Sequence, residues 1–433
     1  MKVAILAGGK GTRLGLVDRP KSMVMIGGTP LLERLIETAR LAGLTDIVLL
    51  TGHMAEVIED HFGDGGRFGV RITHVREHTP LGTAGAVRAA RTLFDAPFLL
   101  LYGDTLLDVD LGRMAAFHAK SGALATVFVH PNDHPHDSDL VEADESGRIV
   151  RLLTKPHAEG ALLPNLVSAA LYVLDPAAID YVPDSGIGDW ARDVFPAMLD
   201  AGEMLCAYRS LEYVKDMGTP DRLVRGEADL ASGRVARLSL RDTKPAIFLD
   251  RDGVLNVEIN GVHDAASLVL TDEAAAAVRA INLAGVPAIC VTNQPDIAKG
   301  LMTFDDLRAV SAALDTGLAR GQAYLDDMFF CPHHPERGWP GEVAALKISC
   351  DCRKPAAGML EAAAERHRLD LRRSWLVGDR LSDIAAAQAA GSRGILLGGG
   401  NPAPDQHLYP AIVPDHVAVG LMDAVTHALS ELS

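Results

Sequence analysis

The chain has 433 residues, of which 48% are hydrophobic and 23% charged, so it can close two or three ordinary cores and is not a disordered protein. It carries 41 basic and 57 acidic side chains, and this acidic balance disfavours a general nucleic-acid or anionic-membrane surface. Neither a signal peptide nor the ~18 continuous apolar residues of a membrane span can be found. The composition indicates a cytoplasmic protein without nucleic-acid or membrane partners, and it is compatible with a homo-oligomer.

Short apolar runs alternate with helical patterns almost throughout the chain. This alternation predicts the α/β class, with two Rossmann-like domains that each contain a mostly parallel sheet flanked by helices. Between residues 222 and 244 the chain turns polar and helix-friendly, before a fresh strand begins at Ala246. We therefore expect a first domain over residues 1–225, a linker over 226–244 and a second domain over 245–433.

The first expected strand ends in a glycine-rich loop, Leu-Ala-Gly-Gly-Lys-Gly-Thr-Arg-Leu, over residues 6–14. Its glycines would let backbone N–H groups approach a polyphosphate closely, and Arg13 and Lys21 can offset the phosphate charge. The alternative is a tight turn after a strand.

Two carboxylates follow later strands of this half. Asp104 comes after the apolar run 98–102, and Asp216 precedes Met-Gly-Thr-Pro. Such a pair can hold the Mg²⁺ that accompanies a nucleoside triphosphate. Taken singly, each is more typical of a turn residue or a helix cap than of a metal ligand.

Six short motifs, in order, resemble the sugar-1-phosphate nucleotidylyltransferase family over residues 1–225. They are the glycine loop, Arg-Pro-Lys-Ser-Met (19–23), Gly-Thr-Ala-Gly (82–85), Tyr-Gly-Asp (102–104), Leu-Thr-Lys-Pro (153–156) and Asp-Met-Gly-Thr-Pro (216–220). The resemblance implies in-line attack of a sugar 1-phosphate on the α-phosphorus of a nucleoside triphosphate, with loss of pyrophosphate and no protein nucleophile. It also implies the ligands: Gly8, Gly9, Gly11, Thr12 and Arg13 around the triphosphate, Lys21 at the phosphates, Gly82, Thr83 and Gly85 along the base, Asp104 and Asp216 at Mg²⁺, and Lys155 at the sugar phosphate. Because Ser-Ala-Ala (168–170) stands where the family often has Asn-Ala-Gly, the sugar is left open.

The second half opens with a buried strand, residues 246–249, that ends in two acids. Asp250 can attack phosphorus as a nucleophile, and Asp252 can donate a proton to the leaving oxygen and later activate water. Three further motifs supply groups for a phosphoryl site: Thr292 and Asn293 after a strand, Lys354 in Arg-Lys-Pro, and Asp379 after another strand. In this order they resemble the haloacid dehalogenase superfamily of phosphotransferases over residues 245–400. The resemblance implies Mg²⁺ held by Asp250, Asp252 and Asp379, with Asp383 bracing the site.

Three cysteines and a histidine form a separate cluster in this half. Cys331, His333, Cys350 and Cys352 match the donor set of a closed tetrahedral Zn²⁺ site, which is structural because it leaves no open position. The alternatives are reduced loop cysteines without metal, or His334 as the fourth ligand. Since Arg353 and Lys354 directly follow the last cysteine, zinc would fix the loop that carries them, with Arg353 in contact with substrate.

The zinc loop, together with Asp-Arg-Asp-Gly-Val-Leu-Asn and Thr-Asn-Gln, resembles the heptose-1,7-bisphosphate 7-phosphatases, although Pro-Asp (295–296) replaces their usual Ser-Gly. The two resemblances imply one route, in which the 7-phosphate of D-glycero-D-manno-heptose 1,7-bisphosphate is removed and a nucleotidyl group, GMP from GTP, is added to the sugar 1-phosphate. Alternatives remain: a histidinol-phosphate-type phosphatase, another sugar or nucleotide, or a first half that binds nucleotides without catalysis.

Overall fold

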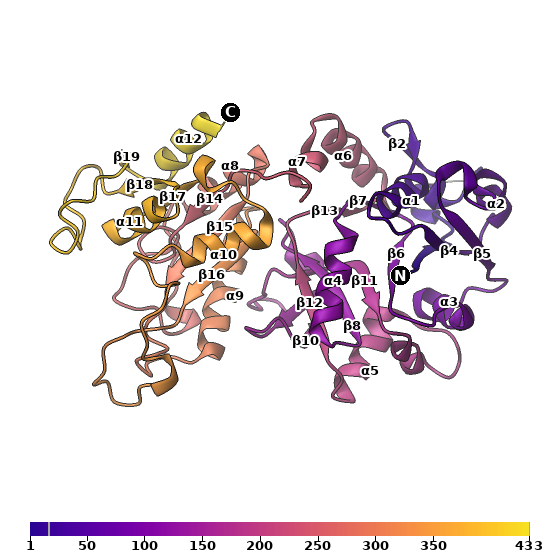
Figure 1. Ribbon diagram of the computed structural model, residues 1–433, viewed down its shortest axis with the longest axis horizontal. Helices are drawn as coiled ribbons and strands as arrows, with labels where there is room; N and C mark the ends of the chain where they lie inside the picture. The colour runs from indigo at the N-terminus through magenta and orange to yellow at the C-terminus, as the bar shows by residue number, and fades with distance from the viewer. Residues whose placement is uncertain (16–17, 433) are drawn as a thin grey trace. The chain divides into compact units, whose positions relative to one another are not determined.

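The computed structural model describes residues 1–15 and 18–432. The chain forms two compact units (Figure 1), and each is described here by itself. Unit 1 contains Met1–His130, Val141–Thr154 and Ser168–Arg241, and unit 2 contains Pro131–Leu140, Lys155–Val167 and the chain from Asp242 onward.

Unit 1 is built on a nine-stranded, mostly parallel sheet with strand β1 near its middle. β1 pairs in parallel with β4 and with β6, and β6 pairs antiparallel with β11. The strand order is β10-β9-β11-β6-β1-β4-β5, and β12 joins through β8, which pairs with β11. The strands are β1 Val3–Ala7, β4 Asp46–Thr51, β5 Arg71–Arg76, β6 Phe98–Tyr102, β8 Ala125–His130, β9 Leu140–Ala143, β10 Ile149–Leu153, β11 Val167–Leu174 and β12 Leu205–Arg209, with the smaller pairs β2 Met25–Ile26 with β3 Thr29–Pro30 and β7 Thr105–Asp108 with β13 Tyr213–Asp216.

Alternate residues of the central strands share one core, as the period of a strand requires. Val3 and Ile5 of β1 lie in the same hydrophobic cluster as Leu99 and Leu101 of β6. The helices of the unit are α1 Leu31–Leu41, α2 Ala55–Phe62, α3 Gly82–Ala89, α4 Leu111–Ser121, α5 Phe195–Asp200, α6 Pro220–Ala231 and α7 Arg234–Leu238. Much of the expected linker is therefore helical: Leu230 and Val235 of α6 and α7 pack on Ile26 and Leu31 in a second cluster of unit 1.

Unit 2 contains a six-stranded sheet in which every pair is parallel, in the order β16-β15-β14-β17-β18-β19. The strands are β14 Ile247–Leu249, β15 Ala288–Asn293, β16 Asp327–Cys331, β17 Trp375–Gly378, β18 Arg393–Leu397 and β19 His416–Ala418; the helices are α8 Ala274–Ala284, α9 Phe304–Arg320, α10 Gly358–His367, α11 Leu381–Ala389 and α12 Leu421–Leu432. Ile247 and Leu249 pack with α8, α9 and α12, whereas Phe248 packs with α10 and α11. Because helices cover both faces, the central strands β14 and β17 are apolar throughout. The predicted α/β class, with mostly parallel sheets flanked by helices, is confirmed.

Two segments from the first half of the sequence, Pro131–Leu140 and Lys155–Val167, belong to unit 2, and we call them the arms. The backbone of the second arm bonds to side chains of helix α9: the Leu163 N–H donates to Thr316 Oγ1 (2.8 Å) and the Asn165 N–H to Asp315 Oδ2 (2.9 Å). Unit 2 is thus assembled from three stretches of chain.

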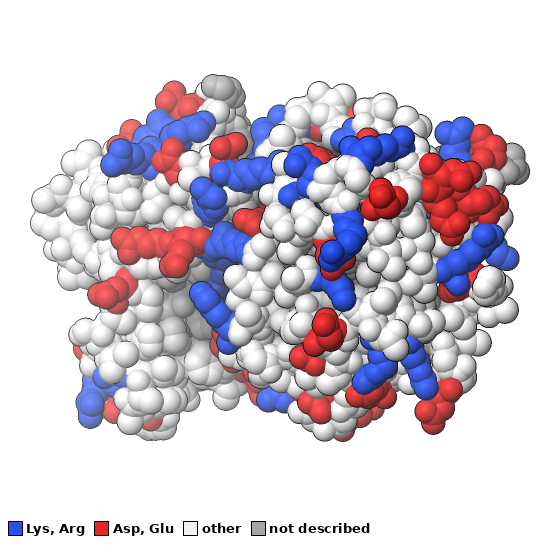
Figure 2. All heavy atoms as spheres, turned by 45° about the vertical axis from the view of Figure 1, so that its right-hand side comes forward, with Lys and Arg blue, Asp and Glu red and all other residues white. Residues whose placement is uncertain are grey.

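Charged side chains of both signs are exposed on the surface. Basic and acidic side chains lie interspersed over the face shown in Figure 2. Within residues 1–15 and 18–432, no helix is both long and apolar enough to cross a membrane.

Candidate active sites

A cavity of about 750 Å³ opens at the carboxyl ends of β1 and β6 in unit 1, which is where open α/β sheets place their ligands. Six of the predicted residues line it: Gly8, Gly9, Lys21, Gly82, Thr83 and Asp104. The other loop residues, Gly11, Thr12 and Arg13, lie next in the chain, at the start of a short 3₁₀ helix. These six predicted residues therefore meet around one space, whereas Gly11, Thr12, Arg13 and Gly85 are not among the residues that line it.

Lys21 joins the two predicted metal-binding carboxylates. Its ammonium group forms an ion pair with Asp104 and lies 3.7 Å from Asp216 Oδ1. Arg222, which the sequence analysis did not single out, pairs with the other side of Asp216. The carboxylate oxygens of Asp104 and Asp216 are ligands of the kind that Mg²⁺ prefers. The Lys21 ammonium group beside them can bind a phosphate.

The glycines at the start of α3 are required by a close backbone approach. Gly82 has φ 75°, and a Cβ at Gly82 or Gly85 would collide with the carbonyl oxygen of Gly188 or Gly186. Gly82 thus lies in the cavity wall, and Gly85 packs the helix behind it against the backbone of Gly186.

Asp189 and Trp190 were missed by sequence reasoning, yet they hold Thr83 in place. The Thr83 hydroxyl donates to Asp189 Oδ2 (2.9 Å), and the Trp190 indole N–H donates to the Thr83 carbonyl (3.2 Å). Nothing in their local pattern distinguishes them from an ordinary helix start, where Asp189 is the N-cap.

Glu77 is another residue that the sequence analysis missed, and it lines the same cavity. A Cβ on Gly8 would lie 2.5 Å from Glu77 Oε1, and one on Gly52 2.9 Å from it, so the carboxylate packs directly on two backbones. The Leu81 N–H donates to Oε2 at 3.4 Å. Burial raises the pKa of Glu77 above its ordinary value, because desolvation penalises the charged carboxylate.

Lys155 belongs to the arms of unit 2. Its ammonium group donates to the Asp137 carbonyl (2.8 Å) and pairs with Asp137 Oδ1 (3.1 Å). The predicted contact of Lys155 with a sugar phosphate stays a prediction.

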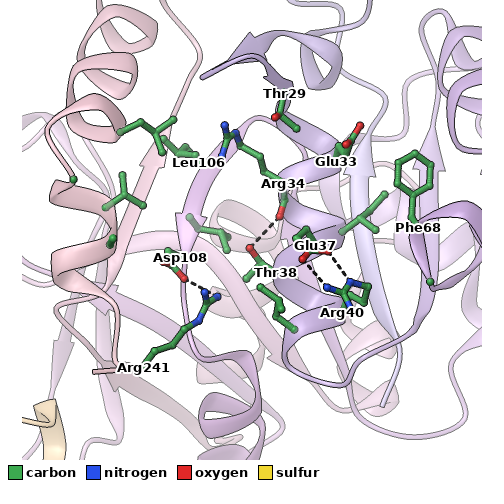
Figure 3. A pocket seen from close by; sticks show the side chains of 18 of the residues that line it. Thr29, Glu33, Arg34, Glu37, Thr38, Arg40, Phe68, Leu106, Asp108 and Arg241 are labelled. Carbon is green, nitrogen blue, oxygen red and sulfur yellow. Dashed lines mark hydrogen bonds and ion pairs between the residues drawn. The ribbon is translucent and has the colours of Figure 1, made fainter. Parts of the chain in front are cut away.

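A second cavity of unit 1, about 770 Å³ in volume, lies between α1, β7 and helices α6 and α7 (Figure 3). Its charged side chains are engaged with each other: Arg40 with Glu37 (2.6 Å) and Arg241 with Asp108 (3.1 Å). Arg34 donates to the Ile26 carbonyl. These pairs build the wall of the cavity and supply no nucleophile.

In unit 2 the predicted nucleophile lies in a buried charge cluster. Lys354 Nζ is 2.8 Å from Asp250 Oδ1 and 2.6 Å from Asp383 Oδ1. Asp250, Asp379 and Asp383 offer oxygens that all lie within 4.8 Å of one another. Asp379 Oδ1 is buried and has no hydrogen-bond partner in the described part of the chain. Three clustered carboxylates with an unpartnered oxygen fit a divalent cation.

The cluster is electrostatically strained by its burial. Desolvation raises the pKa of Asp250 to about 7 and that of Asp379 to about 6. Burial alone would lower the pKa of Lys354, but the two carboxylates beside it raise the value. A cation at this site would relieve the same strain.

Asp252, which is not part of that group of oxygens, is oriented by three donors. Its carboxylate accepts from Arg251 Nη2 (2.9 Å), Asn256 Nδ2 (3.0 Å) and Gln294 Nε2 (2.9 Å). These partners were not singled out from the sequence, although they stand inside the quoted motifs. They orient the acid that is predicted to transfer protons.

Thr292 and Asn293 lie at the end of β15 and line a cavity of about 650 Å³ together with Asp250, Asp252, Arg353 and Lys354. The Asn293 amide donates to the Lys354 carbonyl (3.0 Å), and the Lys354 N–H donates to Asn293 Oδ1 (3.0 Å). This two-way bond fixes the loop that carries Lys354. The predicted contact of Asn293 with substrate stays a prediction.

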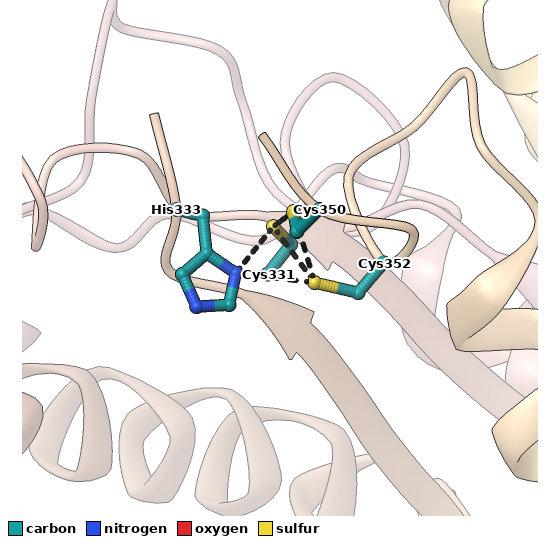
Figure 4. A group of neighbouring side chains, drawn as sticks. All are labelled: Cys331, His333, Cys350 and Cys352. Carbon is teal, nitrogen blue, oxygen red and sulfur yellow. Dashed lines mark hydrogen bonds between the residues drawn. The ribbon is translucent and has the colours of Figure 1, made fainter. Parts of the chain in front are cut away.

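The four predicted zinc ligands converge on one point (Figure 4). Their sulfurs are 3.2–3.5 Å apart, and His333 Nδ1 is 3.3 Å from Cys352 Sγ. A tetrahedral Zn²⁺ with Zn–S bonds of ~2.3 Å would require sulfurs roughly 3.8 Å apart, so the geometry fits after a small expansion. His334 instead packs on Trp339.

In comparisons with known proteins, the two halves of the chain match two different families. The nucleotidyl transferase family model matches residues 2–233, and the HAD-hydrolase-like model matches residues 351–424. A mannose-1-phosphate guanylyltransferase from Mycobacterium tuberculosis is 34% identical over 241 residues, which are 55% of this chain and 66% of that protein. The chain thus spans just under two thirds of this relative's length.

A D-glycero-beta-D-manno-heptose-1,7-bisphosphate 7-phosphatase from Yersinia pestis is 40% identical over 146 residues, which are 34% of this chain and 76% of that protein. Among solved structures, HddC from Yersinia pseudotuberculosis complexed with GMP-PN is 24% identical, with a TM-score of 0.46, and covers 53% of this chain and 99% of its own.

Proposed function

We propose that this chain, which belongs to the nucleotidyl transferase family in its N-terminal half and to the HAD-like phosphatases in its C-terminal half, catalyses two consecutive steps of nucleotide-activated heptose synthesis. Residues 245–433 hydrolyse the 7-phosphate of D-glycero-D-manno-heptose 1,7-bisphosphate. Residues 1–225 then transfer GMP from GTP to the heptose 1-phosphate. The observation that carries the proposal is the buried Asp250–Lys354–Asp383 cluster in one chain with the glycine-loop cavity of unit 1.

In the phosphatase, an Asp250 oxygen attacks the phosphorus of the 7-phosphate. The bond to the sugar oxygen breaks, and Asp252 donates a proton to that oxygen. Water, deprotonated by Asp252, then attacks the aspartyl phosphate and releases inorganic phosphate. Lys354 neutralises the charge of the phosphoryl group in both steps.

Two metals fit the residues. Asp250, Asp379 and Asp383 would hold Mg²⁺, with Asp252 as a further predicted ligand, and the ion would offset phosphoryl charge. Cys331, His333, Cys350 and Cys352 would hold Zn²⁺ as a structural ion, and Asp104 with Asp216 would hold the Mg²⁺ of the nucleotide.

In the transferase, the phosphate oxygen of the heptose 1-phosphate attacks the α-phosphorus in line, and pyrophosphate leaves. Gly8 and Gly9 offer backbone N–H groups to the phosphates, and Lys21 supplies positive charge. Gly11, Thr12, Arg13 and Lys155 complete the predicted contacts.

Glu77 supports GTP as the nucleotide. Guanine presents two neighbouring N–H donors, at N1 and N2, which a carboxylate accepts with both oxygens. Adenine, cytosine and uracil each present at least one acceptor at this edge, and a carboxylate repels it. Relatives over the same part of the chain include both a guanylyltransferase and a uridylyltransferase, so the choice of GTP rests on Glu77.

One assay tests both steps. The full chain is offered each anomer of the 1,7-bisphosphate with GTP, ATP, CTP or UTP, and the products are identified by mass. We expect release of one phosphate, then a GDP-heptose and pyrophosphate with GTP. Nucleotide transfer with CTP or UTP in place of GTP would refute the guanylyl assignment, and an intact bisphosphate would refute the heptose assignment.

A further inference from the structure

One wall of the phosphatase cavity is formed by a segment that the reaction above does not use. Residues 398–415, between β18 and β19 (Figure 1), contain no helix or strand. Asp405, Leu408 and Tyr409 from this segment line the same cavity as Asp250 and Lys354. We call this segment the C-terminal wall.

The C-terminal wall is anchored at the start of α11. The buried Asp405 carboxylate accepts from the Leu381 N–H (2.8 Å) and the Ser382 N–H (3.0 Å). These residues directly precede Asp383, which bonds Lys354. The wall is therefore tied to the same helix end that supports the reaction centre.

Packing fixes the wall as well. Tyr409 and Ile412 pack on a cluster that contains Leu381 and Ile384 of α11. Leu408, next to Tyr409, remains 64% exposed although it lines the cavity. A large aliphatic side chain gains nothing from water at such a place, whereas it gains by contact with an apolar surface.

The wall differs chemically from the rest of the cavity, which is mainly charged or amide-bearing and includes Glu258, Asn260, Asn293, Asp296, Lys299, Arg353 and Arg380. Phosphate groups need such polar partners and gain little from a ring or an isobutyl group. A sugar skeleton needs both, because its hydroxyls alternate with C–H faces, and an amphipathic tyrosine suits it.

We propose that Tyr409 and Leu408 contact the C–H face of the substrate's sugar skeleton, so that the C-terminal wall selects sugar phosphates over small phosphate compounds that lack a sugar skeleton. The proposal rests on the phosphatase function given above and adds its specificity residues. Binding the wall to α11 through Asp405 keeps this contact in register with Asp250.

The test compares the full chain with Tyr409→Ala, Tyr409→Phe and Leu408→Ala on a panel of both heptose 1,7-bisphosphate anomers, fructose 1,6-bisphosphate, glucose 6-phosphate and acetyl phosphate. For the preferred sugar phosphate we expect kcat/KM relative to acetyl phosphate to fall about tenfold in Tyr409→Ala and about threefold in Leu408→Ala, through KM. Tyr409→Phe keeps the ring and should stay within about twofold. Val413→Ala, on the same segment, 71% exposed and outside the cavity, is the matched control.

Equal losses on sugar phosphates and acetyl phosphate would overturn the proposal, as would unchanged kinetics in both alanine variants. Leu408 is exposed, so its variant keeps the test valid if Tyr409→Ala folds poorly. An unaltered protein that prefers another sugar phosphate would refute the heptose function, and the same comparison on that sugar would still decide the role of the wall. Equal efficiency of acetyl phosphate and every sugar phosphate would also overturn it.

Discussion

Lys354 shows how the phosphatase centre keeps a buried cation. Its side chain is only 2% exposed and lies between Asp250 and Asp383. Removing the sole partner of a buried charge typically costs ~3–5 kcal/mol. Because two carboxylates share this cation, one of them can lose its charge while the other still compensates Lys354.

We therefore expect Asp250→Asn to fold and to release no phosphate, since an amide is no nucleophile for phosphorus. The measurement is inorganic phosphate release from the heptose bisphosphate. Formation of the sugar nucleotide from added heptose 1-phosphate and GTP by the same variant is the control and should be unchanged. Phosphate release at the rate of the unaltered protein would rule out the covalent route.

The variant Glu77→Gln tests whether Glu77 recognises the guanine base of GTP. A glutamine offers one donor and one acceptor, a pair that matches uracil N3–H and O4 and mismatches guanine. We expect kcat/KM for GTP in nucleotidyl transfer to added heptose 1-phosphate to fall about 10- to 100-fold, the value of one well-formed bidentate pair, and the UTP to GTP ratio to rise. Glu145→Gln, exposed in unit 1, should leave the ratio unchanged. An unaltered GTP preference in Glu77→Gln would show that the base binds elsewhere.

Glu212 provides a pH-dependent contribution to the stability of unit 1. Burial raises its pKa from 4.5 to about 7, although the Asp110 N–H (2.7 Å) and the Ser210 hydroxyl (2.9 Å) donate to it. The folded state thus holds this proton more tightly than the unfolded state. Consequently, the free energy of unfolding falls as pH rises from about 4.5 to about 7, by roughly 3 kcal/mol at most.

In Glu212→Gln that fall should disappear, because the amide does not titrate and can still accept from Asp110. The measurement is urea unfolding of the full chain at pH 5 and pH 8, compared between the two proteins. Glu145→Gln should retain the pH dependence of the unaltered protein. A Glu212→Gln variant with an identical pH dependence would contradict the assignment.

Among the secondary-structure elements, the sequence predicted those site residues that directly follow an apolar strand. Asp104, Asp250 and Asp379 follow strands that are apolar on both faces, so both the strand and the acid beyond it are legible. Glu77 and Asp405 could not be found this way. Each gains its meaning from partners far along the chain, the backbone of Gly8 in one case and the start of α11 in the other.

The zinc loop is the element whose chemistry was most readable, since Cys331 and His333 stand two residues apart, as do Cys350 and Cys352. We expect Cys352→Ser to lose about one zinc per chain, measured by elemental analysis, and to lower phosphatase kcat/KM about 10- to 100-fold. The reason is that Lys354 follows Cys352 by two residues and would lose its fixed loop.

The control for this prediction is Cys206→Ser, a cysteine of β12 outside the cluster. It should keep both the zinc and the phosphatase activity. A Cys352→Ser protein with full activity and no zinc would show that zinc is not needed to hold the loop of Lys354.

For the whole molecule, the two units are not two consecutive stretches of chain, because unit 2 includes the arms from the first half of the sequence. The sequence suggested one change of domain near residues 226–244, because composition reports only local preference. The arms cross into unit 2 much earlier, since Leu163 and Asn165 find their acceptors on α9, 150 or more residues away. The residue pattern of the arms gives no indication that they bind helix α9.

This arrangement makes a prediction about the isolated phosphatase. A fragment that starts at Asp242 lacks both arms, so Thr316 and Asp315 lose their backbone donors. In the full chain, Thr316→Val leaves the Leu163 N–H without an acceptor and should cost about 1–2 kcal/mol, or ~2–4 °C in the temperature at which phosphatase activity is lost. In the fragment the same change should have almost no effect, because Leu163 is absent.

The difference between the two backgrounds isolates the contact, as in a double-mutant cycle. Ser311→Ala is the matched control, since its hydroxyl donates within α9 to the Leu307 carbonyl and should shift both proteins equally. The fragment itself should lose activity at a lower temperature than the full chain, because α9 loses the packing and hydrogen bonds of the arms together. Equal shifts for Thr316→Val in fragment and full chain would mean that the arms do not stabilise unit 2, and that the phosphatase folds from the chain after Asp242 alone.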